Sequence, residues 1–348
     1  MLKYYLLDQS HKNIAVHKPE IVPDQRDTVL ARWILYIILI AVVYISVSYS
    51  FYLAIAAPLK DTRMMIHQKV IEGTAPKPIQ YRILTYYIVE GVHRLTGMAV
   101  WRLDLVLRFI FTTLSCIYLF MFMRRWFDFA ASAIGALIIP GLLPVTYIDY
   151  IHQPGDMPNL FFTILALIAI SRRKEAWLLL LIPVAMLNRE SFILVLWAWV
   201  FFNYDRLPFK LLLTEFALLG VIALAVYFAL PYYYGPRLNS TETIQLKNNF
   251  DPDMMYKWVT RLLAFSGPLF IASMIKFKSK PIFLRRSLGF VLIFLVVNFL
   301  FAKYQETRLF LPILPVMIPL GLAVIFPAHD PDREPGIEAS DKVEPISA

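Results

Sequence analysis

The stretch AWLLLLIPVAMLNRESFILVLWAWVFF, residues 176–202, is apolar except for Asn188, Arg189 and Glu190 near its centre. A run of this length could cross a membrane as one helix. However, a charged residue at the middle of a bilayer costs roughly 3 kcal/mol even by translocon-insertion scales. Such residues therefore face a protein interior or a water-filled cavity. The triplet has two interpretations: a buried ion pair that ties helices together, or the wall of a site within the membrane.

Basic clusters elsewhere in the chain decide how this stretch crosses. If residues 176–203 cross once, the cations of 276–286 fall on the opposite side of the membrane from Arg124 and Arg125. The positive-inside rule opposes that arrangement. If 176–187 and 191–203 are instead two short helices that meet at 188–190, these clusters and both termini lie on the cytoplasmic side. The sequence therefore predicts a helical hairpin at 176–203.

Each arm of this hairpin is too short to span a bilayer. Twelve residues of helix, at about 1.5 Å per residue, cover about 18 Å, against a hydrocarbon core of ~30 Å. Backbone that leaves the helix at this depth is tolerated only where protein or water covers it. We therefore expect a cavity at the bend, open to the outer side of the membrane.

Composition places the whole chain in the same class. Of the 348 residues, 59% are hydrophobic and only 17% are charged, whereas soluble domains are nearer half apolar and about a quarter charged. The net charge of +9 comes from basic residues that lie mostly between apolar runs, which is typical of membrane topology and does not indicate a nucleic-acid partner. The single cysteine, Cys116, excludes an intramolecular disulfide.

We predict an all-α, polytopic protein of the plasma (inner) membrane with about ten membrane segments. Its transmembrane domain occupies residues 33–326, between a cytoplasmic lead-in at 1–32 and a disordered cytoplasmic tail at 327–348. The oligomeric state stays open. Besides the two arms of the hairpin, the expected crossings are 33–57, 105–123, 128–148, 158–171, 210–231, 258–275, 287–302 and 308–326.

The first outer loop, residues 58–104, carries seven cations, which favours an anionic partner such as a phosphate or a lipid headgroup. Residues 83–96 of this loop are predicted to form a helix that lies at the membrane interface. This prediction depends on one apolar face, formed by Ile83, Leu84, Tyr87, Ile88, Gly91 and Leu95.

Polar side chains gather at the outer ends of several predicted segments. Arginines supply forked, permanently charged donors that suit phosphate oxygens. A carboxylate can take a proton from an attacking hydroxyl group. Together, such groups suit a phosphate-bearing, hydroxyl-rich ligand. The residues are Asp61 and Arg63; Gln80, Tyr81 and Arg82; Asp149, His152, Gln153 and Asp156; Asn188, Arg189 and Glu190; and Lys303, Tyr304, Gln305, Glu306 and Arg308.

A metal site is the alternative use of one of these turns. His152 and Asp156 are four residues apart, a spacing that can hold a metal on a helix, but Pro154 and Gly155 between them favour a turn. A metal site also needs three or four ligands. We therefore predict no metal and no other cofactor.

Five short motifs follow one another along the chain. Asp61 comes just after the first predicted helix, Glu72-Gly73 leads through a Pro-rich stretch to residues 81–84 (YRIL), and Asp-x-Pro-Asn occupies 156–159. Arg-Glu at 189–190 and Glu-Thr-Arg at 306–308 complete the series, before a Leu/Pro-rich last helix. Over roughly residues 30–326, this order resembles the GT-C superfamily of integral membrane glycosyltransferases and their uncharacterised bacterial relatives.

The resemblance implies sugar transfer at the outer face, with a polyprenyl-phosphate-linked sugar as donor. The expected partners are therefore this donor and membrane lipid. The first-loop acidic residue of the family acts as general base, and Asp61 is the matching position. By their chemistry, Arg82, Arg189 and Arg308 would hold the lipid phosphate. The predicted substrate-binding set also includes Arg63, Asp156, Glu190 and Glu306.

The sequence is also compatible with two other functions. Charges within the membrane and a broken helix pair are also found in transporters and lipid-handling proteins, which move a substrate without changing it. A subunit of a membrane complex could use the charged triplet only to fix its helix packing.

Overall fold

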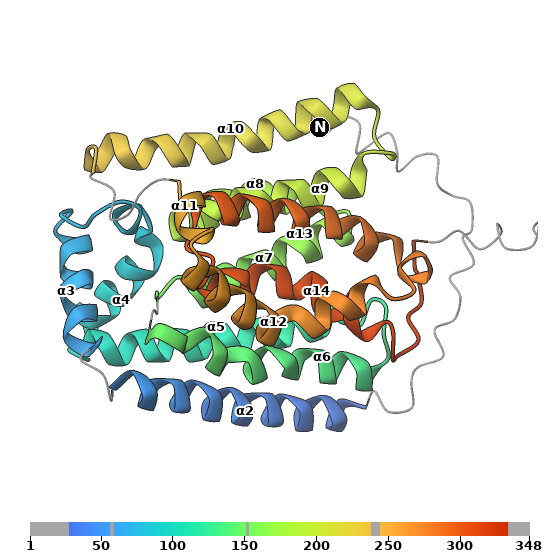
Figure 1. Cartoon of the computed structure of the whole chain (residues 1–348), viewed down its shortest axis with the longest axis horizontal. Helices are drawn as coiled ribbons and strands as arrows, with labels where there is room; N and C mark the ends of the chain where they lie inside the picture. Colours follow the sequence, from blue (N-terminus) through green and yellow to red (C-terminus); the bar gives the residue numbers. More distant parts are fainter. Residues whose placement is uncertain (1–27, 56–58, 151–152, 238–243, 333–348) are drawn as a thin grey trace, which may run out of the picture.

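The computed structural model describes residues 28–55, 59–150, 153–237 and 244–332, and this part of the chain is helical, without a β-strand (Figure 1). Most of the predicted lead-in (1–32) and tail (327–348) lies outside the described residues, as does His152. The long helices lie beside one another along the long axis of the molecule. They are α2 (Val29–Ile55), α5 (Val100–Met123), α10 (Phe209–Tyr234), α12 (Pro252–Met274) and α13 (Ile282–Phe301), together with the shorter α6 (Phe129–Leu142), which continues directly into η2 (Leu143–Tyr150).

Shorter helices complete the bundle. In the predicted outer loop, residues 58–104, they are α3 (Leu59–Ile71), η1 (Ile79–Tyr81) and α4 (Ile83–Thr96). Within the bundle they are η2 (Leu143–Tyr150), α7 (Asp156–Ser171), α8 (Ala176–Asn188), η3 (Glu190–Leu194), α9 (Val195–Asn203), α11 (Leu246–Asn249), η4 (Phe277–Ser279), η5 (Thr307–Ile313) and α14 (Leu314–Leu322). The predicted all-α fold is therefore confirmed, and α3 is an additional helix that the sequence did not indicate.

Five stretches within the described residues are long and apolar enough to cross a membrane: Val29–Tyr49, Val100–Met123, Phe129–Thr146, Phe209–Tyr234 and Ile282–Phe301. Four further apolar stretches are shorter: Asp156–Ser171, Ala176–Asn188, Glu190–Asn203 and Thr307–Leu322. The chain thus has the composition and helix lengths of a membrane protein.

The predicted break at the centre of 176–203 is present. Helix α8 ends at Asn188, Arg189 has an extended backbone (φ −160°, ψ 126°), and η3 begins at Glu190. Glu175, which precedes α8, lies within interaction range of Asn203 at the end of α9, so the far ends of the two arms come back together. The two arms therefore form a hairpin with the charged triplet at its bend.

The centre of the bundle is built from α7 and α14. Every residue of α14 is buried, including its two prolines, and almost all of α7 is buried as well. At the end of the bundle away from α3 and α4, an aromatic cluster packs around Phe283. The centre of its ring lies 5.5 Å from that of Trp126 and 4.8 Å from that of Phe202. The buried helices α7 and η5–α14 both begin on the side of the bundle that faces the outer loop. That placement brings their first turns together.

Helices α3 and α4 form a cap at one end of the bundle (Figure 1). The buried Gln80 side chain holds the loop between them, accepting from the Ala75 amide (2.9 Å) and donating to the Val70 carbonyl (3.1 Å). His67 on α3 also contacts Glu90 on α4 (3.0 Å). Hydrogen bonds from His67 and Arg94 hold the pKa of Glu90 below its usual range.

Lys280 belongs to the basic cluster at 276–286 but, unlike a surface cation, it is buried. Its side chain is 3% exposed, and its Nζ donates to the carbonyls of Ala272 (2.8 Å), Ser273 (2.8 Å) and Leu320 (2.7 Å). A buried ammonium group with three acceptors fastens the end of α12 to the central helix α14.

We expect Lys280→Met to destabilise the protein by about 1–3 kcal/mol, because buried carbonyls lose a charged donor. The measurement is the midpoint of thermal unfolding in detergent. The matched control is Lys278→Met, since Lys278 is exposed two residues away and its loss should change stability by less than about 0.5 kcal/mol. Equal midpoints for the two variants would show that the three hydrogen bonds do not matter.

Candidate functional site

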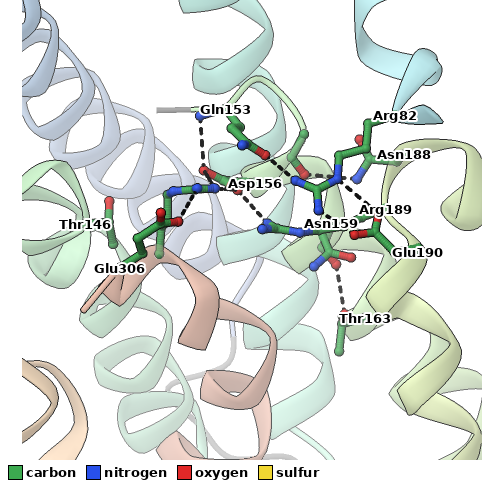
Figure 2. A network of polar contacts seen from close by, with 12 residues as sticks. Arg82, Thr146, Gln153, Asp156, Asn159, Thr163, Asn188, Arg189, Glu190 and Glu306 are labelled. Carbon is green, nitrogen blue, oxygen red and sulfur yellow. Dashed lines mark hydrogen bonds and ion pairs between the residues drawn. The ribbon is translucent and has the colours of Figure 1, made fainter. Parts of the chain in front are cut away.

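The first turns of the buried helices meet the hairpin bend and the cap in one polar network (Figure 2). Asp156 is the first residue of α7, and Arg82 lies between η1 and α4. Arg189 and Glu190 form the bend of the hairpin, while Glu306 and Arg308 lie at the start of η5. Four segments that are distant in sequence therefore contribute to a single site.

Asp156 is the centre of this network. Its Oδ1 accepts hydrogen bonds from Nη1 of Arg189 (2.6 Å) and from Nη1 of Arg308 (3.1 Å). Its Oδ2 accepts a hydrogen bond from the backbone N–H of Gln153 (3.3 Å). The side chain of Asp156 is 2% exposed and those of both arginines are 5% exposed. Two cations thus share one carboxylate in a low-dielectric interior, where charge interactions are strong.

A second pair connects the hairpin to the cap. Arg82 Nε donates to Glu190 Oε2 (3.0 Å), and Arg82 Nη2 contacts the other oxygen of the same carboxylate. Arg82 Nη1 contacts the amide oxygen of Gln153, beside Asp156. This forked geometry fixes both side chains. The Glu190 side chain is about a third exposed, which makes it the most exposed carboxylate of the network.

The start of η5 is held from two directions. Arg308 Nη2 contacts Glu306, and Thr307 Oγ1 donates to the Val145 carbonyl of η2 (2.8 Å). These contacts orient Arg308 toward Asp156.

Gly155 allows the hairpin bend to approach α7 closely. Asn188 Nδ2 donates to the Gly155 carbonyl (2.9 Å), and a Cβ atom at position 155 would lie 2.8 Å from Asn188 Oδ1. Only glycine fits this approach without moving Asn188. The close packing is what brings Arg189 within reach of Asp156.

The arginines of this network have more donors than the described residues use. A guanidinium carries five N–H groups. Within the described chain, Arg189 donates only through Nη1, to Asp156, and the buried Nε of Arg308 has no hydrogen-bond partner. Buried donors without acceptors are rare in proteins, and a bound water or ion is one explanation for them. Acceptor-rich anions such as phosphate match this donor set.

Six predicted site residues come together in this network, namely Arg82, Asp156, Arg189, Glu190, Glu306 and Arg308. Asp61 and Arg63 do not join it by any direct contact shown for the described residues. Asp61 is exposed in the first turn of α3, and Arg63 on the same helix acts electrostatically on Asp104 of α5. The side chain of Asp149 lies outside the described residues.

Two charged residues of this region were missed from the sequence. Arg108 is buried, donates to Thr146 Oγ1 (3.4 Å) and acts electrostatically on Asp156. Asp104 is buried one turn earlier on α5. Their spacing of four residues in a largely apolar helix, which places both on one face, is the signal that could have found them.

Two cavities lie elsewhere in the molecule. One of about 320 Å³ lies beside the start of η5, and another of about 290 Å³ lies at the end of α14. Neither is lined by a residue of the arginine network, and the predicted cavity at the bend stays a prediction. No group of three or more His, Cys, Asp or Glu side chains in the described chain is arranged to hold a metal ion. The first cavity is lined by Asn248, Asn249, Asp251, Met254, Lys303 and Gln305.

Comparisons of this chain with protein-family models, with curated proteins and with solved structures gave no match.

We expect Asp156→Asn to destabilise the protein by about 3–5 kcal/mol, because it leaves Arg189 and Arg308 buried without their shared counter-charge. Thermal unfolding in detergent measures this loss. Asp61→Asn is the matched control, since this exposed carboxylate should contribute less than about 0.5 kcal/mol. If both variants unfold at the wild-type temperature, Asp156 is not the electrostatic centre of the site.

Proposed function

We propose that this protein is a membrane glycosyltransferase that moves a sugar from a polyprenyl-phosphate carrier to an acceptor at the outer face of the membrane. The observation that carries the proposal is the set of buried arginines with unused donors around Asp156. A lipid-linked phosphate supplies the acceptor oxygens that these donors lack. The short arms of the hairpin support access for such a lipid, because each arm covers only part of the bilayer.

In this reaction the arginines act on the leaving group. As the bond between the sugar and the phosphate breaks, negative charge grows on the departing phosphate oxygen. Fixed guanidinium groups in a water-poor site stabilise that charge more in the transition state than in the ground state. Arg189 and Arg308 are held in place by Asp156, and Arg82 by Glu190, so the donors need no rearrangement. The base that the resemblance implies, Asp61, stays a prediction.

We propose that the protein lies in the plasma (inner) membrane, which it crosses with ten membrane segments. Both termini are then in the cytoplasm. The support for this topology is the clustering of cations at one end of the bundle. Arg125 pairs with Asp332 (3.0 Å), at the end of the described chain, and Arg286 pairs with Asp205 (2.7 Å). In this arrangement the shorter apolar helices and α12 supply the five segments beyond the long apolar stretches.

We also propose that α4 lies at the outer membrane interface. Four of the six residues of its predicted apolar face, Tyr87, Ile88, Gly91 and Leu95, are exposed, and the neighbouring Val92 is exposed as well. Leu95 is 87% exposed. An exposed apolar stripe on a cap helix is typical of contact with the boundary between headgroups and acyl chains.

An environment-sensitive fluorophore on Leu95→Cys tests this placement. The single native cysteine, Cys116, is fully buried, so the label will attach to the introduced thiol. We expect its emission to shift to shorter wavelength when the protein is placed in lipid vesicles, because position 95 enters an apolar environment. The control is Gln68→Cys on the exposed face of α3. Identical spectra at the two positions would contradict the placement.

Arg189→Gln tests the proposed function. We expect the release of polyprenyl phosphate from a polyprenyl-phosphate-linked sugar, in membranes that contain the native acceptors, to fall by at least ~10²-fold. Arg189→Lys should recover only part of the rate, because it restores the charge without the fork. Arg94→Gln is the control, since its side chain is 70% exposed on the cap.

Binding of the product separates transfer from transport. Polyprenyl phosphate should raise the unfolding temperature of the wild type and raise it less in Arg189→Gln. If it stabilises both proteins equally, Arg189 does not hold the phosphate. If the wild type binds polyprenyl phosphate but releases none from any sugar-linked donor, a lipid-handling function without chemistry is the better account.

A further inference from the structure

Asp104 is a buried carboxylate in the first turns of α5, and it has no evident structural purpose. It is 4% exposed, and its Oδ1 has no hydrogen-bond partner within the described chain. Buried carboxylates are normally paired, because an ionised group loses its hydration when it leaves water. Asp104 therefore destabilises the fold unless a ligand or a reaction uses it.

A polar stripe on α5 includes this residue. Asp104, Arg108 and Thr112 follow one another at intervals of four residues and are all buried, so they face the interior of the bundle together. Thr112 Oγ1 also lacks a partner within the described residues. The stripe thus presents unused polar atoms along one wall of the interior.

Tyr86 relates Asp104 to the arginine network. This buried tyrosine of α4 lies within electrostatic range of Asp104 and also of Arg82, Asp156 and Arg308. Arg108 lies one turn along α5 from Asp104 and acts electrostatically on Asp156. Asp104 therefore belongs to the neighbourhood of the proposed phosphate site, on the side of α5.

The other carboxylates of this neighbourhood are occupied. Asp156 accepts from two arginines, Glu190 is held by Arg82, and Glu306 is held by Arg308. A carboxylate engaged in this way orients its partners and is a poor proton acceptor. Among the carboxylates around the arginines, Asp104 is the one without an ion pair or a hydrogen bond in the described part of the chain.

We propose that Asp104 binds the attacking hydroxyl group of the sugar acceptor and takes up its proton. This proposal rests on the proposed glycosyl transfer. The O–H bond breaks as the proton moves to the Asp104 carboxylate, and the hydroxyl oxygen forms a bond to the anomeric carbon of the donor. The bond from that carbon to the phosphate oxygen breaks, its electron pair leaves with the polyprenyl phosphate, and the proton later returns to water.

The proposal assigns to Asp104 the proton transfer that the resemblance implies for Asp61. We expect Asp104→Asn to reduce release of polyprenyl phosphate from the sugar-linked donor by at least ~10²-fold. Asp253→Asn, which changes an exposed carboxylate of α12 outside the network, should stay within about threefold of the wild type. Asp104→Asn should still gain the wild-type increase in unfolding temperature from polyprenyl phosphate, because the arginines are intact. Without ligand, its unfolding temperature should equal or exceed that of the wild type, since an unpaired buried charge is removed.

Each other outcome decides the matter. If Asp104→Asn keeps its transfer rate while Arg189→Gln loses it, Asp104 has no catalytic role and the proposed function stands. If Asp104→Asn unfolds at a clearly lower temperature, the residue is structural and the proposal fails. If the wild type itself transfers no sugar from hexose- or pentose-linked polyprenyl phosphates, the proposed function fails, and the role of Asp104 fails with it.

Discussion

The pairing of Asp156 with Arg189 and Arg308 is the interaction on which the rest of the site depends. Asp156 begins α7, Arg189 is the bend of the hairpin, and Arg308 begins the last buried helix pair, so one carboxylate fixes three elements of the bundle. None of the three charges could remain in the interior alone, because an isolated ion there loses its hydration without compensation. The fold and the site are therefore stabilised by the same contacts.

Charge also explains why much of the architecture could be predicted from sequence. The positive-inside rule required an even number of arms in 176–203, and the helix break at Arg189 lies where the triplet interrupts the apolar run. The convergence of Arg82, Asp156 and Arg308 agrees with their predicted positions at the ends of different segments on one side of the membrane. Such reasoning needs only the direction of each helix, which hydropathy and charge supply.

The residues that could not be predicted depend on the rotation of a helix about its axis. Asp104 and Arg108 lie in an apolar helix, and whether such side chains face lipid or interior depends on packing against α7 and the cap. Lys280 counted as one more cytoplasmic cation, yet its four-carbon stem reaches back into the bundle to three carbonyls. A long, flexible side chain near exposed helix ends can reach many carbonyl groups, so its hydrogen-bond partners cannot be predicted from its position in the sequence.

The two arginines that share Asp156 arrive at very different times during synthesis. Arg189 is 33 residues after Asp156, whereas Arg308 is 152 residues after it. As the chain leaves the ribosome, Asp156 and the hairpin can therefore neutralise one another early, as a charge-balanced pair that enters the membrane together. The second cation joins only when nearly all of the described chain has been made, and it brings Glu306 with it, so the network is completed late without a change in its net charge.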